Sequence, residues 1–395
     1  MGKIAFLIFP IALVLYEIIV YLSNDMNLPS LPSLEKDFNT TREMTQYTLL
    51  TWFLGSASLQ LVMGPLADRF GRRIVLLVGG LFFIISTIFC ASTHNITIML
   101  IARFVQGTAV CSVLVAGYAA IHELYESKTA IQVITIMGAA TFLAPAFGPI
   151  IGAFIIELSN WRAIFWLLAF LAILVISLLF KTMPETNKES VPIRLKSIYS
   201  DYKSIIFNRS FMRFAFPFWL IDMAMIVWIV ESPYLIIETY QQSVITFGVI
   251  QLLVFGCFII GAQITNVLIN KMQSIKIIEA GLTISLLGVA LLFIAALLYT
   301  QLWFVTVSLM IISMGSAMSL GPLNRLAIEA SQAPMGSRTA IFSAIMGLFG
   351  VIATLLVSLL SEMNAQNLAL LIGPAMIFAL LLFKILHQKT TAIPV

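Results

Sequence analysis

Apolar runs of membrane-spanning length recur from one end of this 395-residue chain to the other. A helix needs about 20 predominantly apolar residues to cross the hydrocarbon core of a bilayer. The connections between the runs are short, and 60% of all residues are hydrophobic whereas only 10% are charged. This pattern excludes a soluble globular domain and predicts an all-α protein that crosses the membrane many times.

The runs predict twelve spans in two sets of six, at residues 6–28, 44–67, 73–92, 97–121, 130–156, 161–181, 213–237, 245–269, 275–298, 302–325, 338–361 and 366–386. A polar stretch divides the two sets. We therefore expect an N-terminal six-helix bundle at 1–183, a cytoplasmic linker at 184–212 and a C-terminal six-helix bundle at 213–395. Two equal halves are typical of the parallel repeats of secondary transporters.

Basic residues indicate the orientation of the spans. With an even number of spans both termini share one side, and that side carries 18 of the 22 lysines and arginines. The other side keeps Lys36, Arg42 and Arg162, while Arg103 lies inside a span. Because cytoplasmic loops are enriched in basic residues, the termini and the linker are predicted to be cytoplasmic.

Two carboxylates lie within the first span, Glu17 near its middle and Asp25 near its outer end. They are about 12 Å apart along an ideal helix axis and about 80° apart around it, so both can line one hydrated face. Burial disfavours the charged form of a carboxyl group. We therefore expect Glu17 and Asp25 to bind a proton or a cation and to release it elsewhere.

Arg103 lies about six residues into the fourth span, at a depth similar to that of Asp25. An arginine keeps its charge and needs an acceptor or water in the membrane. We expect it to pair with Asp25 or to share a water with it, with Gln106 as a further hydrogen-bonding group. The alternative is a side chain that extends to the outer headgroups.

The seventh span carries two more acids, Asp222 near mid-membrane and Glu231 near the outer end. They are about 180° apart on an ideal helix, so they share a cavity face only if the helix deforms, for example at Pro233. We rank Asp222 above Glu231 as a cavity residue. The alternative for Glu231 is a carboxylate at the outer interface.

The turn between the second and third spans, at 64–73, has an ordered pattern formed by Gly64, Asp68, Arg69, Gly71 and Arg72. Gly71 supplies backbone freedom for a tight cytoplasmic turn. Asp68 can accept hydrogen bonds from the arginines and from a neighbouring helix N-terminus.

Small residues repeat every four positions in the fifth span, and two of them are Gly148 and Gly152. They give the helix a smooth face for close packing, and Pro145 and Pro149 permit bending. Together with Gly138 they suit an element that opens and closes, although plain helix packing explains the spacing equally well.

These patterns resemble the major facilitator superfamily along all twelve spans. The turn at 64–73 resembles its G-x-x-x-D-R-x-G-R-R signature, Arg103-x-x-Gln106-Gly107 its fourth-helix motif, and 138–152 its antiporter motif. The first span, with Tyr16, Glu17, Tyr21, Asn24 and Asp25, is similar to MdfA-type proton-coupled multidrug exporters of the drug:proton antiporter group with twelve spans. Tyr118–Glu123 and Ser232-Pro233 also resemble that group, whereas Asp222 and Glu231 are not part of its pattern.

The resemblance implies an alternating-access fold with a central cavity between two six-helix bundles, and a multi-pass location in the bacterial inner membrane. It also implies that the acids matching Glu17 and Asp25 take part in substrate recognition and proton exchange. Several aromatic residues could add apolar or cation–π contacts: Tyr16, Tyr21, Trp52, Tyr118, Phe142, Trp219 and Trp228. Each of them could equally serve as packing or as an interfacial anchor.

The leading hypothesis is a proton-coupled efflux antiporter that exports lipophilic, cationic drugs or other small molecules. The alternative is a proton-coupled transporter of a particular metabolite or siderophore, in either direction, with Arg103 binding an anionic group. We expect a monomer in the lipid bilayer with a small-molecule substrate, the proton as coupling ion, no cofactor and no nucleic acid. A membrane enzyme is disfavoured because no buried histidine set or metal site is evident. A sensory or structural protein would not explain charges at membrane depth.

Overall fold

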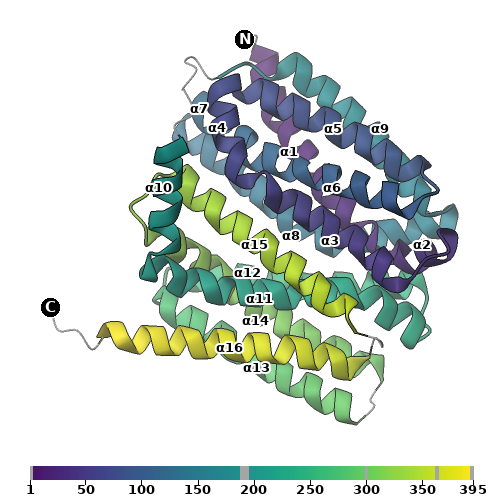
Figure 1. Ribbon diagram of the computed structural model, residues 1–395. Helices are drawn as coiled ribbons and strands as arrows, with labels where there is room; N and C mark the ends of the chain where they lie inside the picture. Colours follow the sequence, from purple (N-terminus) through teal and green to yellow (C-terminus); the bar gives the residue numbers. More distant parts are fainter. Residues whose placement is uncertain (1–2, 187–194, 299–300, 361–363, 392–395) are drawn as a thin grey trace. The chain divides into compact units, whose positions relative to one another are not determined.

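The computed structural model describes the backbone of residues 3–186, 195–298, 301–360 and 364–391. Side chains are described for these residues except 3–7, 127–128, 131–132, 135, 138–142, 195–198 and 386–391. Within this part of the chain every regular element is a helix (Figure 1). The chain forms two compact units, Met1–Ile198 and Tyr199–Val395.

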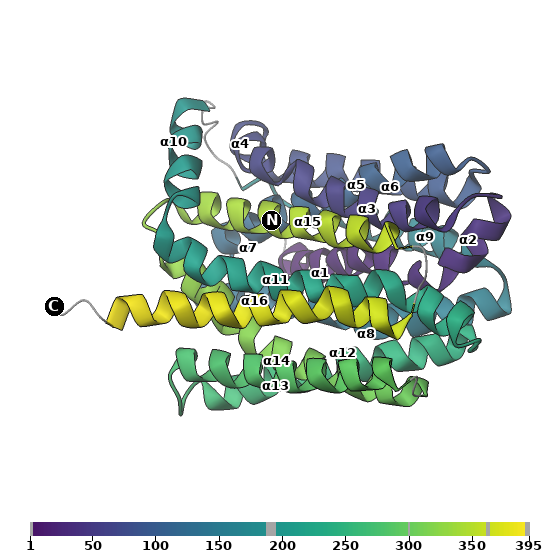
Figure 2. The ribbon, with the colours of Figure 1, turned by 60° about the horizontal axis from the view of Figure 1, so that its bottom comes forward.

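The N-terminal unit contains α1 Lys3–Asp25, η1 Leu28–Ser30, α2 Leu31–Asp37, α3 Arg42–Ser58, α4 Gln60–Phe70, α5 Arg72–Ser92, α6 Ile96–Ser112, η2 Val113–Gly117, α7 Tyr118–Leu124, α8 Ser127–Leu158 and α9 Trp161–Thr182. Helix α10, Leu195–Ile206, crosses the boundary between the units. The C-terminal unit continues with α11 Arg209–Pro233, η3 Tyr234–Thr239, α12 Val244–Leu268, α13 Ser274–Leu297, α14 Leu302–Glu329, α15 Met335–Ser358 and α16 Ala365–Thr391. In Figure 2, α10 stands crosswise to α11.

Among the described residues, ten helices are long and apolar enough to cross a membrane. α3 and α4, with an angle of 47° between them, are together also long and apolar enough for a span. At this bend the Ser58 hydroxyl donates to the Gly55 carbonyl at 2.9 Å and the Cys111 thiol donates to the Ser56 carbonyl at 2.9 Å, so side chains compete with the backbone ladder. Helix α8 covers the remaining predicted span, and Leu143–Leu158 is the apolar part of it in which every side chain is described. The predicted all-α, multi-spanning fold is confirmed.

The two units repeat the same internal packing. In the N-terminal unit the pairs in contact include α1–α8, α1–α9, α1–α6, α3–α6, α5–α6 and α5–α9. In the C-terminal unit the corresponding pairs are α11–α15, α11–α16, α11–α14, α12–α14, α13–α14 and α13–α16. The order of the six spans and their partners therefore agree between the halves, which establishes an internal repeat.

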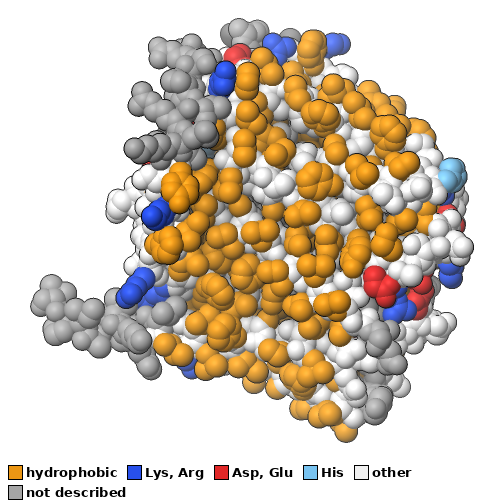
Figure 3. All heavy atoms as spheres, in the orientation of Figure 1, with side chains coloured by type: hydrophobic (Ala, Val, Ile, Leu, Met, Phe, Trp, Pro, Cys, Tyr) orange, Lys and Arg blue, Asp and Glu red, His pale blue; other side chains and the backbone are white. Residues whose placement is uncertain are grey.

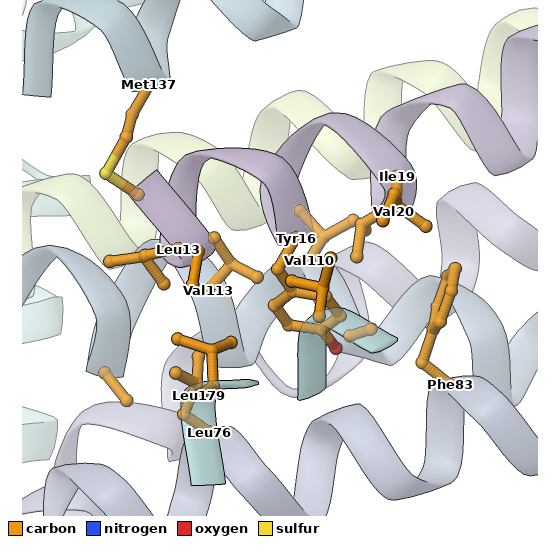
Figure 4. Close-up of a cluster of buried hydrophobic side chains, with 14 of the residues drawn as sticks. Leu13, Tyr16, Ile19, Val20, Leu76, Phe83, Val110, Val113, Met137 and Leu179 are labelled. Carbon is orange, nitrogen blue, oxygen red and sulfur yellow. The ribbon is translucent and has the colours of Figure 1, made fainter. Parts of the chain in front are cut away.

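An apolar cluster fixes the position of α1 within the N-terminal unit (Figure 4). Leu13 and Tyr16 of α1 are fully buried, and the Tyr16 ring packs edge-on against Phe83 of α5 with centroids 6.0 Å apart. Between membrane helices such contacts stabilise through close van der Waals packing. Glu17 follows Tyr16 on the same helix, so this packing also fixes the helix that carries Glu17.

Apolar side chains also cover the outer surface of the helices. On the face seen in Figure 3, hydrophobic side chains spread over the middle, and the acidic and basic side chains lie near its edges. Exposed examples are Phe82, Ile101, Phe170, Leu287 and Phe304. In a bilayer such surfaces face lipid chains, so this exposure agrees with a membrane-embedded protein.

Candidate functional site

Glu17 lies in the interior of the N-terminal unit, with 1% of its surface exposed. The Tyr118 hydroxyl donates to its Oε1 at 3.1 Å. Tyr118 is the first residue of α7 and follows the π-helical segment η2, which re-aims this end of the fourth span. Oε2 of Glu17 is buried and has no hydrogen-bond partner in the described part of the chain. The structure thus brings together two predicted residues and leaves one carboxyl oxygen available.

Asp25 is the last residue of α1 and is 4% exposed. The Asn24 amide donates to its Oδ1 at 3.3 Å. Helix α8 packs directly against this end of α1: a Cβ on Gly148 would lie 2.7 Å from the Asp25 Cβ, and a Cβ on Gly152 would overlap the Met26 carbonyl. The small-residue face of the fifth span therefore lies against the predicted proton site.

Arg103 is completely buried, and its guanidinium group donates to four acceptors. These are the Ser23 carbonyl at 2.8 Å, the Gln106 amide oxygen at 2.6 Å, the Asn24 amide oxygen at 3.0 Å and the Thr48 carbonyl at 3.2 Å. Gln106 in turn donates to the Thr87 hydroxyl at 2.8 Å. The Phe165 ring, with its centroid 6.0 Å from the guanidinium carbon, adds a cation–π contact.

All four acceptors of Arg103 are neutral, so a direct pair with Asp25, the first of the two predicted arrangements, is wrong; a shared water stays a prediction. No ion pair links these two residues within the part of the chain that the structure describes. Asn24 stands between them, since it accepts from Arg103 and donates to Asp25. The Arg103 guanidinium and the Asp25 carboxyl group are therefore linked indirectly, through the side-chain amide of Asn24. The alternative of a side chain that reaches the outer headgroups is also wrong, because Arg103 is 0% exposed.

The predicted turn at 64–73 forms a network at the end of α5. Gly71 adopts φ +99°, a conformation that L side chains rarely take. Arg72 pairs with Asp68 at 2.6 Å and with Glu123 at 3.4 Å. Arg69 lies over the Phe70 ring, 5.3 Å from its centroid, and Gly64 has open space around its α-carbon.

Glu185 supplies an anion at the N-terminus of α5. Its carboxylate accepts from the backbone N–H of Arg72 at 2.9 Å and from that of Arg73 at 3.2 Å. Thr186, next in the chain, donates to Glu123. Sequence reasoning missed Glu123 and Glu185. The signal for Glu185 was present, since an acid directly after the last helix of a bundle can reach a helix N-terminus on the same side of the membrane.

In the C-terminal unit the two predicted acids differ in their surroundings. Asp222 of α11 is half-buried, and Glu231 is fully buried with neither oxygen hydrogen-bonded in the described part of the chain. Trp228 is buried and donates to Gln251 of α12 at 2.9 Å. Glu231 is therefore not an exposed interfacial carboxylate.

The remaining predicted residues lie on the same helices. Tyr21 is half-buried on α1, and Pro145 and Pro149 lie within α8. The surroundings of Gly138 and Phe142 fall outside the residues that the structure describes in full. Trp219 donates to the Phe342 carbonyl at 3.2 Å and therefore serves packing between α11 and α15.

Six-helix repeats with buried acidic and basic groups define a secondary transporter. The sequence matches the family model of the Major Facilitator Superfamily over residues 13–354, and the chain belongs to this superfamily. The resemblance of its motifs to that superfamily is thereby confirmed.

Three named relatives match most of the chain. The chloramphenicol resistance protein CraA of Acinetobacter baumannii is 31% identical over 341 residues, 86% of this chain and 83% of CraA. The multidrug transporter MdfA of Yersinia pestis is 31% identical over 345 residues, 86% of this chain and 83% of MdfA. The multidrug resistance protein MdtM of Escherichia coli K12 is 30% identical over 338 residues, 85% of this chain and 82% of MdtM.

Solved structures support the fold. A D-xylose–proton symporter matches with a TM-score of 0.73 at 19% identity, covering 95% of this chain and 97% of the symporter. An inward-facing bacterial homologue of the lysosomal transporter Spinster matches with a TM-score of 0.71 at 14% identity, covering 98% of this chain and 96% of that protein.

Proposed function

We propose that this chain is a proton-coupled efflux antiporter that exports lipophilic, cationic drugs and similar small molecules across the bacterial inner membrane by alternating access. The observation that carries the proposal is the pair of buried carboxyl groups on α1, Glu17 and Asp25. The relatives named as a multidrug transporter, a multidrug resistance protein and a chloramphenicol resistance protein support drugs as the substrate class.

The chemistry follows from competition at these carboxyl groups. An ionised carboxylate in a buried site needs a compensating positive charge, which either a proton or a cationic substrate supplies. Proton binding therefore releases the cation, and cation binding requires loss of the proton. Inward proton movement supplies about 2.3 kcal/mol per 100 mV and about 1.4 kcal/mol per pH unit.

One carboxyl oxygen of Glu17 is hydrogen-bonded and the other is not, which suits a group that binds a proton and a cationic substrate in turn. Its Oε1 is held by the Tyr118 hydroxyl, while the buried Oε2 has no protein donor in the described part of the chain. Asp25 sits where α8 packs against the end of α1. A movement of α8 would therefore change the surroundings of Asp25 directly, which links proton occupancy to a helix rearrangement.

The alternative function, transport of a metabolite or siderophore whose anionic group binds Arg103, has less support. The donors of Arg103 already serve four protein acceptors, and its side chain is fully buried. An anion would have to displace several of these bonds. The proposal further includes cytoplasmic termini, a monomer, and no cofactor besides the coupling proton.

Reconstituted vesicles test the proposal. In vesicles with an acidic interior, outward proton movement through the native protein should drive uptake of a cationic dye such as ethidium. Glu17→Gln and Asp25→Asn should each reduce this flux at least tenfold, whereas Glu157→Gln, an exposed carboxyl on α8, should not. Undiminished proton-driven flux in the Asp25→Asn protein would refute the assigned role. Transport of polycarboxylates instead of dye would favour the rival substrate class.

A further inference from the structure

Glu231 is a buried acid that the cycle above leaves without a role. Its side chain is 0% exposed, and neither carboxyl oxygen has a hydrogen-bond partner among the described residues. Helices α14, α15 and α16 pack against α11, and α12 contacts it through the Trp228–Gln251 bond. In their membrane portions, 244–268, 302–324, 339–358 and 365–383, these four helices contain no acidic, basic or histidine residue.

No charge on the packed helices can therefore balance an ionised Glu231. On α11 itself the other membrane-embedded acid is Asp222, which lies about 180° around an ideal helix from Glu231. An isolated buried carboxylate is so costly that such a group takes up a proton instead. Glu231 is therefore expected to be protonated and neutral whenever water has no access to it.

The internal repeat identifies the matching position in the N-terminal unit. Gly55 of α3 packs against the Phe104 carbonyl of α6, and Gly261 of α12 packs in the same way against the Met314 carbonyl of α14. Aligning the two contacts places Ser313, which precedes Met314, at the position of Arg103. The Ser313 hydroxyl oxygen is buried and has no hydrogen-bond partner in the described part of the unit.

The first helices of the two units align through their early prolines, Pro10 of α1 and Pro217 of α11. This alignment places Glu231 at the position of Asn24, the residue to which Arg103 donates at 3.0 Å. The C-terminal unit has therefore exchanged an amide for a carboxyl group and an arginine for a serine. Arg103 donates to Asn24 in the N-terminal unit. The counterparts Ser313 and Glu231 have side-chain oxygens without a partner in the described part of the chain.

The backbone beside Glu231 is satisfied by other side chains. Pro233 has no N–H, so the Ile229 carbonyl loses its usual donor, and the Ser232 hydroxyl donates to it at 3.2 Å. Gln251 donates to Ser232 at 2.8 Å. The π-helical segment η3 follows Pro233, and such segments often occur at functional sites. These bonds hold α11 in place without using Glu231.

We propose that Glu231 is a proton-binding carboxyl of the C-terminal unit and that it takes up and releases one proton in each transport cycle. The proton adds to a carboxylate oxygen to form the neutral COOH group, and it returns to water when this end of α11 becomes hydrated. We infer proton binding by Glu231 from the packing of the C-terminal unit alone. The inference that this proton is coupled to transport rests on the proposed antiport function.

Infrared spectroscopy of the purified protein tests proton binding without any transport. Glu17 and Glu231 are the fully buried glutamates of the described chain. In a Glu17→Gln background with ¹³C-labelled glutamate, the isotope-shifted C=O stretch of a protonated, buried carboxyl should remain. Adding Glu231→Gln should abolish it, whereas adding Glu329→Gln, an exposed partner of Arg325, should not. Absence of the band in the Glu17→Gln protein near neutral pH would overturn the proposal, and this arm needs no stable Glu231 variant.

Substrate accumulation in vesicles tests the coupling. With no membrane potential, each coupled proton contributes about a tenfold accumulation per pH unit. The Glu231→Gln protein should therefore accumulate about tenfold less substrate than the native protein at a gradient of one pH unit. Equal accumulation would show a structural carboxyl only and would overturn the coupling. If even the native protein moves no dye or drug, the proposed function fails, and the infrared result still decides whether Glu231 binds a proton.

Discussion

Gly148 of α8 lies directly against Asp25, the last residue of α1, so that a Cβ at position 148 would come within 2.7 Å of the Asp25 Cβ. The fifth span can approach the proposed proton site this closely only because it has a glycine there. Gly152, one turn further on, faces the Met26 carbonyl in the same way. The two glycines therefore let α8 pack closely against the end of α1 that carries the Asp25 carboxyl group.

Gly148→Ala should displace Asp25 and reduce proton-driven flux at least tenfold. The added methyl group overpacks the contact, which costs about 1–3 kcal/mol of stability. Thermal unfolding in detergent and dye flux in vesicles measure the two effects. Gly256→Ala on α12 is the matched control, because nothing lies within 4 Å of its Cβ position. Native flux in the Gly148→Ala protein would contradict a role for this contact.

Arg103→Lys should be destabilising although it keeps the charge. Lysine has three donors, whereas the arginine serves four acceptors. Each buried acceptor left unpaired costs about 1–3 kcal/mol, so a clear fall in unfolding temperature is expected. Arg325→Lys, at an exposed ion pair with Glu329, should change stability by less than about 1 kcal/mol. Equal stability of the two variants would rule out the buried network as a stabilising feature.

The positions of the long helices could be predicted from sequence because apolar runs of spanning length mark them. A helix lies at each of the twelve predicted positions. The bend between α3 and α4 was not predicted, and the Cys111 thiol of another helix bonds to the backbone next to it. Hydropathy predicts two equal halves, and the pairing of the helices within each half shows which helices correspond.

Depth in the membrane predicted which side chains are close, but not which atoms bond. Asp25 and Arg103 were expected to pair because their depths match, yet the guanidinium group found neutral acceptors. Two of these acceptors are backbone carbonyls, of Ser23 and Thr48, which no residue type can signal. The sequence places Glu185 on the same side of the membrane as the start of α5, but the contact itself depends on the packing of α5 against α9.

Gly71→Ala should destabilise the cytoplasmic turn by about 1–3 kcal/mol, the cost of forcing a side chain into a rare backbone conformation. The φ of Gly71 is +99°, and an added Cβ would overlap the Glu185 carboxylate. Gly64→Ala in α4 is the matched variant, because nothing lies within 4 Å of its Cβ position. It should be neutral or gain about 0.5–1 kcal/mol. Thermal unfolding of both proteins decides, and the reverse order would contradict the geometry of the turn.

Glu185→Gln should loosen the start of α5. The carboxylate accepts from two backbone N–H groups and opposes the positive end of the helix dipole, so its loss should cost about 1 kcal/mol. Local opening would then become about fivefold more frequent, and the Arg72 and Arg73 amides should exchange with deuterium faster by that factor. Glu279→Gln, a half-buried carboxyl on α13 of the other unit, should leave these amides unchanged. If the two amides exchange at the native rate in the Glu185→Gln protein, the carboxylate does not cap this helix in solution.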